Sequence, residues 1–326
     1  MNETDKYVLP FPPVVRIEPA ASCNFKCIHC PTGLDMTPTG VMTIETFEKI
    51  ALDLEHIIAE RREQFKITGQ HDYPESPLFR VIVLYHGGEP LLNKNFIEMV
   101  RRSKQLAKFV KTVTNGSRLD DEKIEELINS GLDHIEISLD GISAEENNLI
   151  RVNPLNMTFE VISERVIRLI KQRNKHGLSI PRVSISNTQI PETIDDVTED
   201  PQPPSHMLET FKEVSSDINY NPNWAFVWPG MPLKIHSKPD FNYCDHVVNT
   251  ITIRSNGDVV VCCYDLVSKL PMGNINENSL QEIWNSNRYQ GVRRSIDKYN
   301  PPELCKGCPV LYNFKPMVKS DIFKEK

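Results

Sequence analysis

Apolar runs of strand length alternate with helical patterns through the first two thirds of the chain. Strands are predicted for VVRIEPAA (14–21), RVIVLYHGG (80–88), FVKTVTNG (109–116), HIEISLDG (134–141), RVSISNTQ (182–189) and WAFVW (224–228). Helices are predicted from near Thr43, over residues 93–108, 120–129, 158–175 and 206–216, and after Ser143. This alternation predicts an α/β fold with six β-α units around a parallel sheet.

Two of these helices carry particularly clear signals. The apolar residues after Thr43 recur at a spacing of three and four: Phe47, Ile50, Ala51, Leu54, Ile57 and Ile58. The helix of residues 158–175 is expected to stop at Gly177, because glycine tolerates the left-handed conformation that ends many helices. Both signals indicate regular helices, and the first also predicts a buried face.

A loop interrupts the alternation, and the pattern changes beyond Pro239. Residues 191–204 contain four prolines and five acidic residues, so we expect a surface loop, either a solvated insertion or a lid. Beyond Pro239, NTITIRSNGDVVVCCY (249–264) alternates around a turn as a β-hairpin, and SLQEIWNS (279–286) predicts a short helix. We therefore expect two domains, residues 1–238 and residues 239–326.

Composition narrows the class of protein. The 326 residues are 39% hydrophobic and 25% charged, enough for a large core without disulfides. The formal net charge of -7 offers no positive field for a phosphate backbone, so nucleic acid is not an expected partner. No basic segment followed by an apolar run opens the chain, and no stretch approaches the roughly 18 apolar residues of a membrane span, so we expect a cytoplasmic protein.

The eight cysteines are placed unevenly. Three lie within residues 23–30, five lie within residues 244–308, and none lies between. Disulfides are rare in a reducing cytoplasm, so metal ligation or thiol chemistry is the better explanation.

Cys23, Cys27 and Cys30 form a CxxxCxxC motif directly after the first predicted strand. A closed metal site takes four protein ligands, whereas three thiolates around a four-iron cube leave one iron open for another molecule. The alternatives are a zinc loop completed by His29 and reduced thiols without metal.

CNFKCIHC (23–30) after the first strand, together with HGGEPLL (86–92) at the end of the second, resembles the radical S-adenosylmethionine (SAM) superfamily over roughly residues 14–230. The resemblance implies a partial, TIM-like (β/α)6 barrel. It also implies that the open iron of a [4Fe-4S] cluster binds SAM and that the reduced cluster cleaves it to a 5'-deoxyadenosyl radical.

The same resemblance implies contacts to SAM. Gly87, Gly88 and Glu89 match the motif that holds the methionine amino group. Further positions that resemble SAM contacts are Asn115, Ser138 and Arg151, with His29 near the adenine and Asn187 as another candidate. A plain turn or a solvated arginine is the alternative for the single residues.

Cys244, Cys262, Cys305 and Cys308 supply four thiolates, enough for a closed site of either zinc or an iron-sulfur cluster. The spacing C-x12-G-x4-C, followed by GNINENSLQEIW and CxxC, is similar to the SPASM and twitch domains of radical SAM enzymes. Because the chain lacks the further cysteines of a full SPASM domain, it looks like the shorter twitch form, which implies one auxiliary [4Fe-4S] cluster.

Cys263 remains unassigned. Residues 262 and 263 are expected to point to opposite faces of a strand, so both cannot easily bind one cluster, and we favour Cys262 as the ligand. Cys263 is then a buried structural thiol, an alternative ligand or a hydrogen-atom donor.

A closed second cluster cannot bind SAM, so its natural use is to accept an electron. We expect a radical SAM oxidoreductase that oxidises a hydroxyl-bearing small molecule, resembling the twitch-type 2-deoxy-scyllo-inosamine dehydrogenases, with a flavodoxin or ferredoxin as electron donor. Candidate substrate contacts at the carboxyl ends of the strands are Glu18, Tyr85, His86, Asn187 and Trp228.

Three alternatives remain at this stage. A radical epimerase would use Cys263 to return a hydrogen atom. A peptide-modifying maturase is disfavoured, because about 22 residues before the first cluster cysteine are too few for a leader-binding domain. The non-enzymatic alternative is a zinc-binding interaction module.

Overall fold

The computed structural model describes residues 5–68, 76–197, 199–229, 238–313 and 316–322. Six parallel strands follow one another in space as they do in sequence: β1 (Val14–Ile17), β2 (Phe79–Leu84), β3 (Ala107–Thr114), β4 (His134–Ser138), β5 (Arg182–Gln189) and β6 (Ile218–Trp224). Each strand pairs in parallel with the next, from β1 with β2 to β5 with β6. Within the described residues β6 forms one edge of the sheet and does not pair with β1, so the barrel is open.

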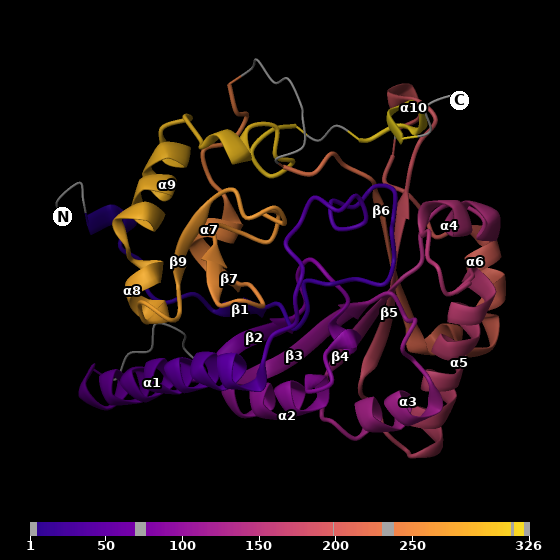
Figure 1. Cartoon of the computed structure of the whole chain (residues 1–326), viewed down its shortest axis with the longest axis horizontal. Helices are drawn as coiled ribbons and strands as arrows, with labels where there is room; N and C mark the ends of the chain where they lie inside the picture. Colours follow the sequence, from indigo (N-terminus) through magenta and orange to yellow (C-terminus); the bar gives the residue numbers. More distant parts are fainter. Residues whose placement is uncertain (1–4, 69–75, 198, 230–237, 314–315, 323–326) are drawn as a thin grey trace.

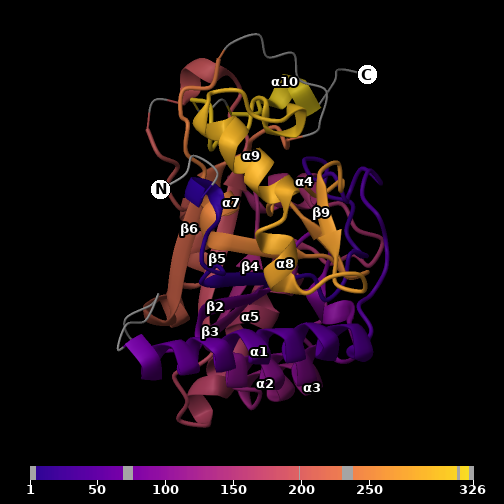
Figure 2. The same ribbon diagram turned by 90° about the vertical axis from the view of Figure 1, so that its left-hand side faces the viewer.

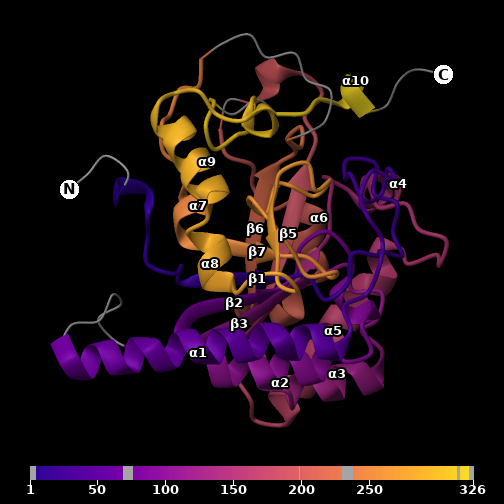
Figure 3. The ribbon, with the colours of Figure 1, turned by 60° about the vertical axis from the view of Figure 1, so that its left-hand side comes forward.

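Helices connect the strands and cover the outer face of the curved sheet. They are α1 (Ile44–Thr68), α2 (Phe96–Leu106), α3 (Asp121–Ile128), α4 (Ala144–Ile150), α5 (Phe159–Lys175) and α6 (Ser205–Thr210). Figure 1 shows α1, α2, α3 and α5 along the outside of the sheet, and Figure 3 shows α1, α2 and α3 together below it. The alternating fold predicted from the sequence is confirmed, including the end of α5, where Gly177 has a φ of 68°.

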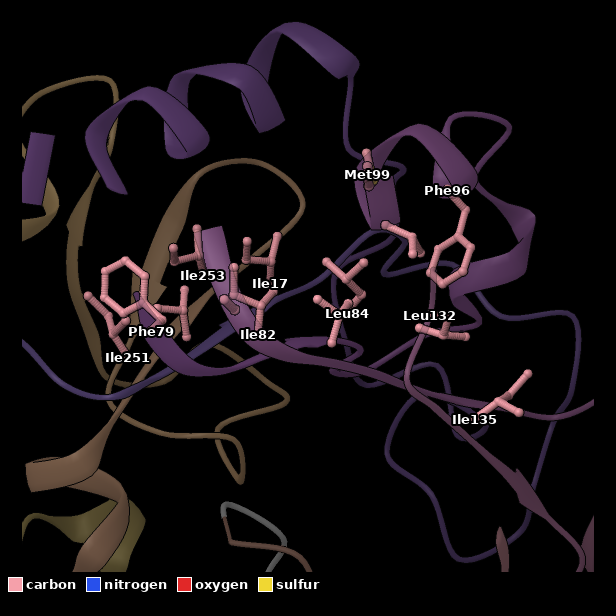
Figure 4. Packing of buried hydrophobic residues seen from close by; sticks show 14 of the residues in the cluster. Ile17, Phe79, Ile82, Leu84, Phe96, Met99, Leu132, Ile135, Ile251 and Ile253 are labelled. Carbon is pink, nitrogen blue, oxygen red and sulfur yellow. The ribbon is translucent and has the colours of Figure 1, made fainter. Parts of the chain in front are cut away.

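The core lies between the sheet and these helices. The predicted apolar face of α1 is buried throughout, with no residue from Phe47 to Ile58 on that face more than 5% exposed. In Figure 4, Ile17 of β1 lies beside Ile82 of β2, while Phe96 and Met99 of α2 approach Leu84 from the helix side. Burial of such side chains is the main favourable term in folding.

The last third of the chain extends the same sheet. It contains α7 (Asp245–Asn249), β7 (Thr250–Ile253), β8 (Asp258–Val260), β9 (Pro271–Asn274), α8 (Leu280–Trp284), α9 (Asn287–Asp297) and α10 (Lys319–Ile322). β7 pairs in parallel with β1, and β8 and β9 follow antiparallel, which confirms the predicted hairpin. Figure 2 shows α8 and α9 on the side of the N-terminal segment, where the Trp284 indole N–H donates to the Pro10 carbonyl at 2.9 Å.

Three predictions about the elements were wrong. The sixth strand is residues 218–224 and not WAFVW (224–228), because an edge strand with one neighbour can expose polar residues and tolerate Pro222. The helix predicted for residues 206–216 is α6 followed by a 3-10 turn with a non-helical Val214. Cys262 and Cys263 lie in a turn after β8 and not on a strand, so the opposite-face argument does not apply.

The Pro-rich segment of residues 191–204 has a single 3-10 turn, Ile194–Asp196, among its described residues. Its backbone contacts the strands, because the Gln189 side chain donates to the Gln202 carbonyl at 2.7 Å. In the part of the chain that the structure describes, no helix is long and apolar enough to cross a membrane.

Candidate active site and cluster-binding cysteines

The carboxyl ends of the parallel strands surround a cavity of about 270 Å³, the place where sheets of this kind form their sites. The loop between β1 and α1 lies along the inner side of the sheet (Figure 1). Of the predicted site residues, the cavity is lined by Cys23, Cys27, His29, Cys30, Tyr85, Gly87, Gly88, Glu89, Asn115, Ser138, Arg151 and Trp228. The fold therefore brings together residues that are up to 205 positions apart in the sequence, from Cys23 to Trp228.

Cys23, Cys27 and Cys30 all border this cavity. Their loop is fixed from outside, because the Ile28 N–H donates to the Ile150 carbonyl at 3.0 Å, and it is turned tightly, because the Cys30 N–H donates to the Cys27 carbonyl at 3.1 Å. Three thiols are thereby presented to one space.

The electrostatics of these thiols fit an iron-sulfur cluster. Burial raises the pKa of Cys23, and it raises the pKa of Cys27 to about 12, although Arg151 opposes both shifts. Thiolates at these positions therefore require a strong positive charge, which bound iron supplies. The three thiols border one cavity.

The Gly87–Glu89 segment is held close to this loop by its backbone. A Cβ on Gly88 would lie 2.3 Å from the Ala20 carbonyl oxygen, so only glycine fits there. The Glu89 N–H donates to the Ser22 carbonyl at 2.9 Å, one residue before the first cysteine. The loop that contains the three cysteines and the loop that contains HGGEP are thus in direct contact.

Glu89 is buried, and its carboxylate is bonded within the protein. It accepts hydrogen bonds from the Thr114 hydroxyl and the Asn115 N–H, both at 2.7 Å, and from the Leu91 N–H at 3.0 Å. Burial raises the pKa of Glu89, while these hydrogen bonds act in the opposite direction. The Asn115 side chain donates to Asn24 at 2.8 Å, which ties the end of β3 to the cysteine loop.

Arg151 is the buried cation of the cavity wall. Its guanidinium forms a 2.7 Å ion pair with Asp140 and lies over the Phe25 ring at 5.4 Å. Burial alone would raise the pKa of Asp140, but the charge and hydrogen bond of Arg151 outweigh it and lower that pKa. The pair fixes the direction of Arg151 toward the cysteine side of the cavity.

Apart from the C-terminal cysteines, three predicted site residues do not line the cavity. Glu18 is fully buried and bonds to Arg254 at 3.0 Å. His86 is 3% exposed, and burial together with two nearby arginines lowers its pKa well below the ordinary value. Asn187 donates to the carbonyls of Leu139 and Gly141 at 2.8 and 2.9 Å, so it fastens the loop after β4.

The structure adds cavity residues that the sequence analysis missed. Glu136 lies two positions before Ser138 on β4, and Ser186 and Thr188 lie on β5. The Glu136 carboxylate accepts a hydrogen bond from the Asn221 side chain at 3.1 Å. The alternation of period two along HIEIS places Glu136 on the same face as Ser138, and this signal could have identified it.

The four C-terminal cysteines predicted as ligands are all buried. Cys308 and Cys305 are joined by a backbone hydrogen bond of 3.2 Å. Burial raises the pKa of all four thiols, while nearby backbone N–H groups act in the opposite direction on Cys244, Cys262 and Cys308.

Cys263 lies close to this group but has its own partner. Its sulfur is 3.7 Å from Nδ1 of His246. Burial acts to raise the pKa of Cys263, but the hydrogen bond of His246 and the charge of Arg16 lower it overall.

Aromatic side chains connect the cavity with the four-cysteine region. Phe226 and Trp228 line the cavity, and their rings lie 5.3 and 5.8 Å from the ring of Tyr264. Tyr264 follows Cys263 directly and contacts His246 edge-on at 5.2 Å. The wall of the cavity is thus in van der Waals contact with the turn that contains Cys262.

This arrangement belongs to a known class of protein. A sequence model of the radical SAM superfamily matches residues 17–200, and one for SPASM, described as an iron-sulfur cluster-binding domain, matches residues 244–309. The chain belongs to the radical SAM superfamily. The predicted cofactors, SAM with its [4Fe-4S] cluster and a C-terminal iron-sulfur site, are thereby confirmed.

The chain is similar to several characterised proteins. The tungsten-containing aldehyde ferredoxin oxidoreductase cofactor-modifying protein of Pyrococcus furiosus is 26% identical over 333 positions, 90% of this chain and 86% of that protein. BtrN in complex with AdoMet and 2-DOIA has a TM-score of 0.54 at 17% identity, covering 90% and 91% of the two chains. The enzyme anSMEcpe with bound AdoMet has a TM-score of 0.58 at 16% identity, covering 94% and 89%. These structures confirm the open α/β barrel.

Proposed function

We propose that the chain is a radical SAM oxidoreductase that oxidises a hydroxyl-bearing small molecule, such as a sugar or cyclitol, to a ketone. One observation carries the proposal: a single cavity borders the three-cysteine loop and the acid Glu136, and aromatic rings join its wall to the four-cysteine turn. A radical source, a base and an electron acceptor are the three parts that such an oxidation requires.

In this proposal the residues around the cysteine loop bind SAM. The backbone of Gly87–Glu89 contacts the methionine amino group, and Arg151, oriented by Asp140, pairs with the carboxylate. Asn115 and Ser138 contact the polar parts of SAM, and His29 lies beside the adenine.

When bound, SAM and the two clusters supply the radical that takes the hydrogen atom from the carbinol carbon and the acceptor for the electron left behind. Glu136 takes the hydroxyl proton. It is suited to this role because, among the described residues, its carboxylate accepts a single hydrogen bond, from the exposed Asn221 side chain. Glu89, by contrast, accepts three hydrogen bonds, and Asp140 pairs with the buried Arg151. The carbinol thus loses a hydrogen atom from its carbon, a proton from its oxygen and one further electron, which leaves a ketone.

The test uses the anaerobically reconstituted enzyme. We expect about eight irons with matching sulfide, and 5'-deoxyadenosine when SAM and a strong reductant are added. With a polyol substrate, Glu136→Gln should lower ketone formation by about 100-fold and leave SAM cleavage without substrate unchanged. Glu122→Gln, at an exposed position of α3, is the matched control. A product at the substrate's oxidation level, or zinc in the C-terminal site, would contradict the proposal.

A second candidate is favoured by the relative of similar length. The Pyrococcus furiosus protein that matches 90% of this chain is named as modifying the cofactor of a tungsten enzyme. The same cavity would then hold an organic cofactor precursor in place of a polyol. Mass spectrometry of the products from the two substrate classes, each compared with a reaction lacking reductant, separates these candidates.

Several further predictions stay untested or remain as alternatives. A flavodoxin or ferredoxin as electron donor, a single auxiliary cluster and a cytoplasmic location stay predictions. The epimerase and the peptide-modifying maturase remain alternatives within the superfamily, whereas the zinc-bound interaction module is wrong, because the chain is a radical SAM enzyme.

A further inference from the structure

A buried ion pair connects the C-terminal hairpin with the first strand of the barrel. Arg254 directly follows β7 and is 2% exposed, and Glu18 directly follows β1 and is 0% exposed. The Arg254 Nε donates to Oε2 of Glu18 at 3.0 Å, and the Ser255 N–H donates to the same oxygen at 3.0 Å. The two residues meet because β1 and β7 pair in parallel and in register.

The other carboxylate oxygen of Glu18 reaches the loop proposed to bind SAM. Oε1 accepts a hydrogen bond from the Gly87 N–H at 3.1 Å, and the Thr32 hydroxyl donates to the Gly87 carbonyl at 2.6 Å. Both of these backbone groups of Gly87 are therefore fixed from outside. One fixing point is on the three-cysteine loop, and the other depends on Arg254.

Arg254 also reaches the turn of the predicted auxiliary ligand Cys262. Its Nη1 donates to the Leu266 carbonyl at 2.6 Å and to the Ser268 hydroxyl at 3.1 Å. The same turn is closed by a hydrogen bond of 3.1 Å from the Asp265 N–H to the Cys262 carbonyl. A short run of direct contacts thus extends from Cys262 through Arg254 and Glu18 to Gly87.

The charges make this connection sensitive to its geometry. A buried carboxylate and guanidinium lose their hydration, and only close pairing compensates for that loss. A displaced Arg254 leaves Glu18 uncompensated, so the two move together. The Gly87 N–H follows because it bonds to the same carboxylate.

We propose that Glu18 and Arg254 are positioning residues that hold the Gly87–Glu89 loop for SAM, and that they make SAM affinity depend on an intact auxiliary-cluster site. The inference rests on the proposed roles of Gly87–Glu89 in SAM binding and of Cys262 as a cluster ligand. It gives Glu18 a role different from the substrate contact that its sequence position predicts.

The test measures the SAM dissociation constant of the reconstituted enzyme without substrate, by the change that SAM causes in the EPR signal of the reduced cluster. Glu18→Gln and Arg254→Lys should each weaken SAM binding by about tenfold or more. Asp53→Ala is the matched control, because it removes the acceptor of the 2.6 Å bond from the Leu280 N–H that also joins the barrel to the C-terminal region. Its SAM affinity should equal that of the unchanged enzyme, even where its thermal midpoint falls.

A second measurement tests the dependence on the auxiliary site. Cys305→Ala alone should lower SAM affinity. Combined with Arg254→Lys, it should weaken SAM binding little further than Arg254→Lys alone does, because both substitutions act through one connection. SAM affinities within about twofold of the unchanged enzyme for both charge variants, or fully additive effects, would overturn the inference. If neither charge variant retains its clusters, Ser268→Ala replaces them in the comparison of SAM affinities, because it removes one contact of Arg254. The proposed oxidation is unaffected by either result, since no substrate is present.

Discussion

The Cys263 side chain distinguishes the proposed oxidation from an epimerisation. Its sulfur is paired with His246 and lies beside Tyr264, which contacts the cavity wall through Phe226 and Trp228. For the proposed oxidation no hydrogen atom returns to the substrate. We therefore expect Cys263→Ala to cleave SAM and form ketone at close to the unchanged rate, as measured by product analysis.

A different result would favour the epimerase. If Cys263→Ala continues to cleave SAM but loses an epimerised product, the thiol is a hydrogen-atom donor. Cys262→Ala is the comparison at the neighbouring position, and it should instead lose the iron of the auxiliary site. Iron analysis of both variants distinguishes a missing ligand from a missing donor.

His134 gives the molecule a dependence on pH that is independent of the clusters. Its ring lies against Phe109 on the inner face of the sheet, and its Nε2 is 2.7 Å from the Ser184 hydroxyl. Burial, with the charges of Lys111 and Arg182, lowers its pKa from 6.5 to about 4. The unfolded chain therefore binds this proton more tightly, and the folded state loses stability as the pH falls from 6.5 toward 4.

Replacing His134 should make the protein less sensitive to mild acid. Between about pH 7.5 and pH 5.5 the unchanged enzyme should lose about 1 kcal/mol more stability than His134→Gln. Thermal unfolding at both pH values measures the difference. A His134→Gln slope equal to that of the unchanged enzyme would contradict the expected shift.

At the scale of elements, the sequence predicts helices and strands with a regular apolar pattern, and it misses elements that are stable only because of their neighbours in the fold. The apolar face from Phe47 to Ile58 is read correctly because its spacing alone determines a buried helix face. β6 is missed because Asn219, Asn221 and Asn223 carry no apolar signal, and only its place at the sheet edge makes such a strand stable. The four-residue β9 also lacks a strong local pattern, whereas α9 was missed although its buried Tyr289, Val292 and Ile296 follow a helical spacing.

The turn after β2 is the element most constrained by its partner. A Cβ at Gly88 would lie 2.3 Å from the Ala20 carbonyl oxygen and 2.5 Å from that of Ser22, and neither backbone atom can rotate away. Gly88→Ala should therefore cost more than about 3 kcal/mol locally and abolish SAM binding, measured by EPR titration. Gly291→Ala, in α9 with open space around its Cβ position, should instead stabilise the protein by about 0.5 to 1 kcal/mol. SAM binding by Gly88→Ala would show that the loop can move away from residues 20–22.

At the scale of the whole molecule, the motifs predict which residues carry the chemistry, but only the fold shows how they meet. The contact between CNFKCIHC and HGGEP follows from two adjacent parallel strands, so it was within reach of the sequence. The bond between Glu18 and Arg254, 236 positions apart, was not, because nothing local indicates that β7 pairs with β1. The position of Glu136 was partly predictable, because its strand was predicted and the face of the strand on which it lies could be inferred.

The predicted boundary at residue 238 stays a prediction, and the pairing of β7 with β1 suggests how to test it. Ile251 and Ile253 of β7 are 0% exposed and pack with Ile17, Ile82 and Phe79 in one continuous core (Figure 4). A chain that ends at residue 238 would expose this apolar surface and leave β1 as an unpaired edge, which favours aggregation. We therefore expect residues 1–238 to form no stable monomer, as measured by size-exclusion chromatography and thermal unfolding. A cooperative transition within a few degrees of that of the full chain would show instead that the barrel folds independently, and that the C-terminal strands are added to a sheet already stable without them.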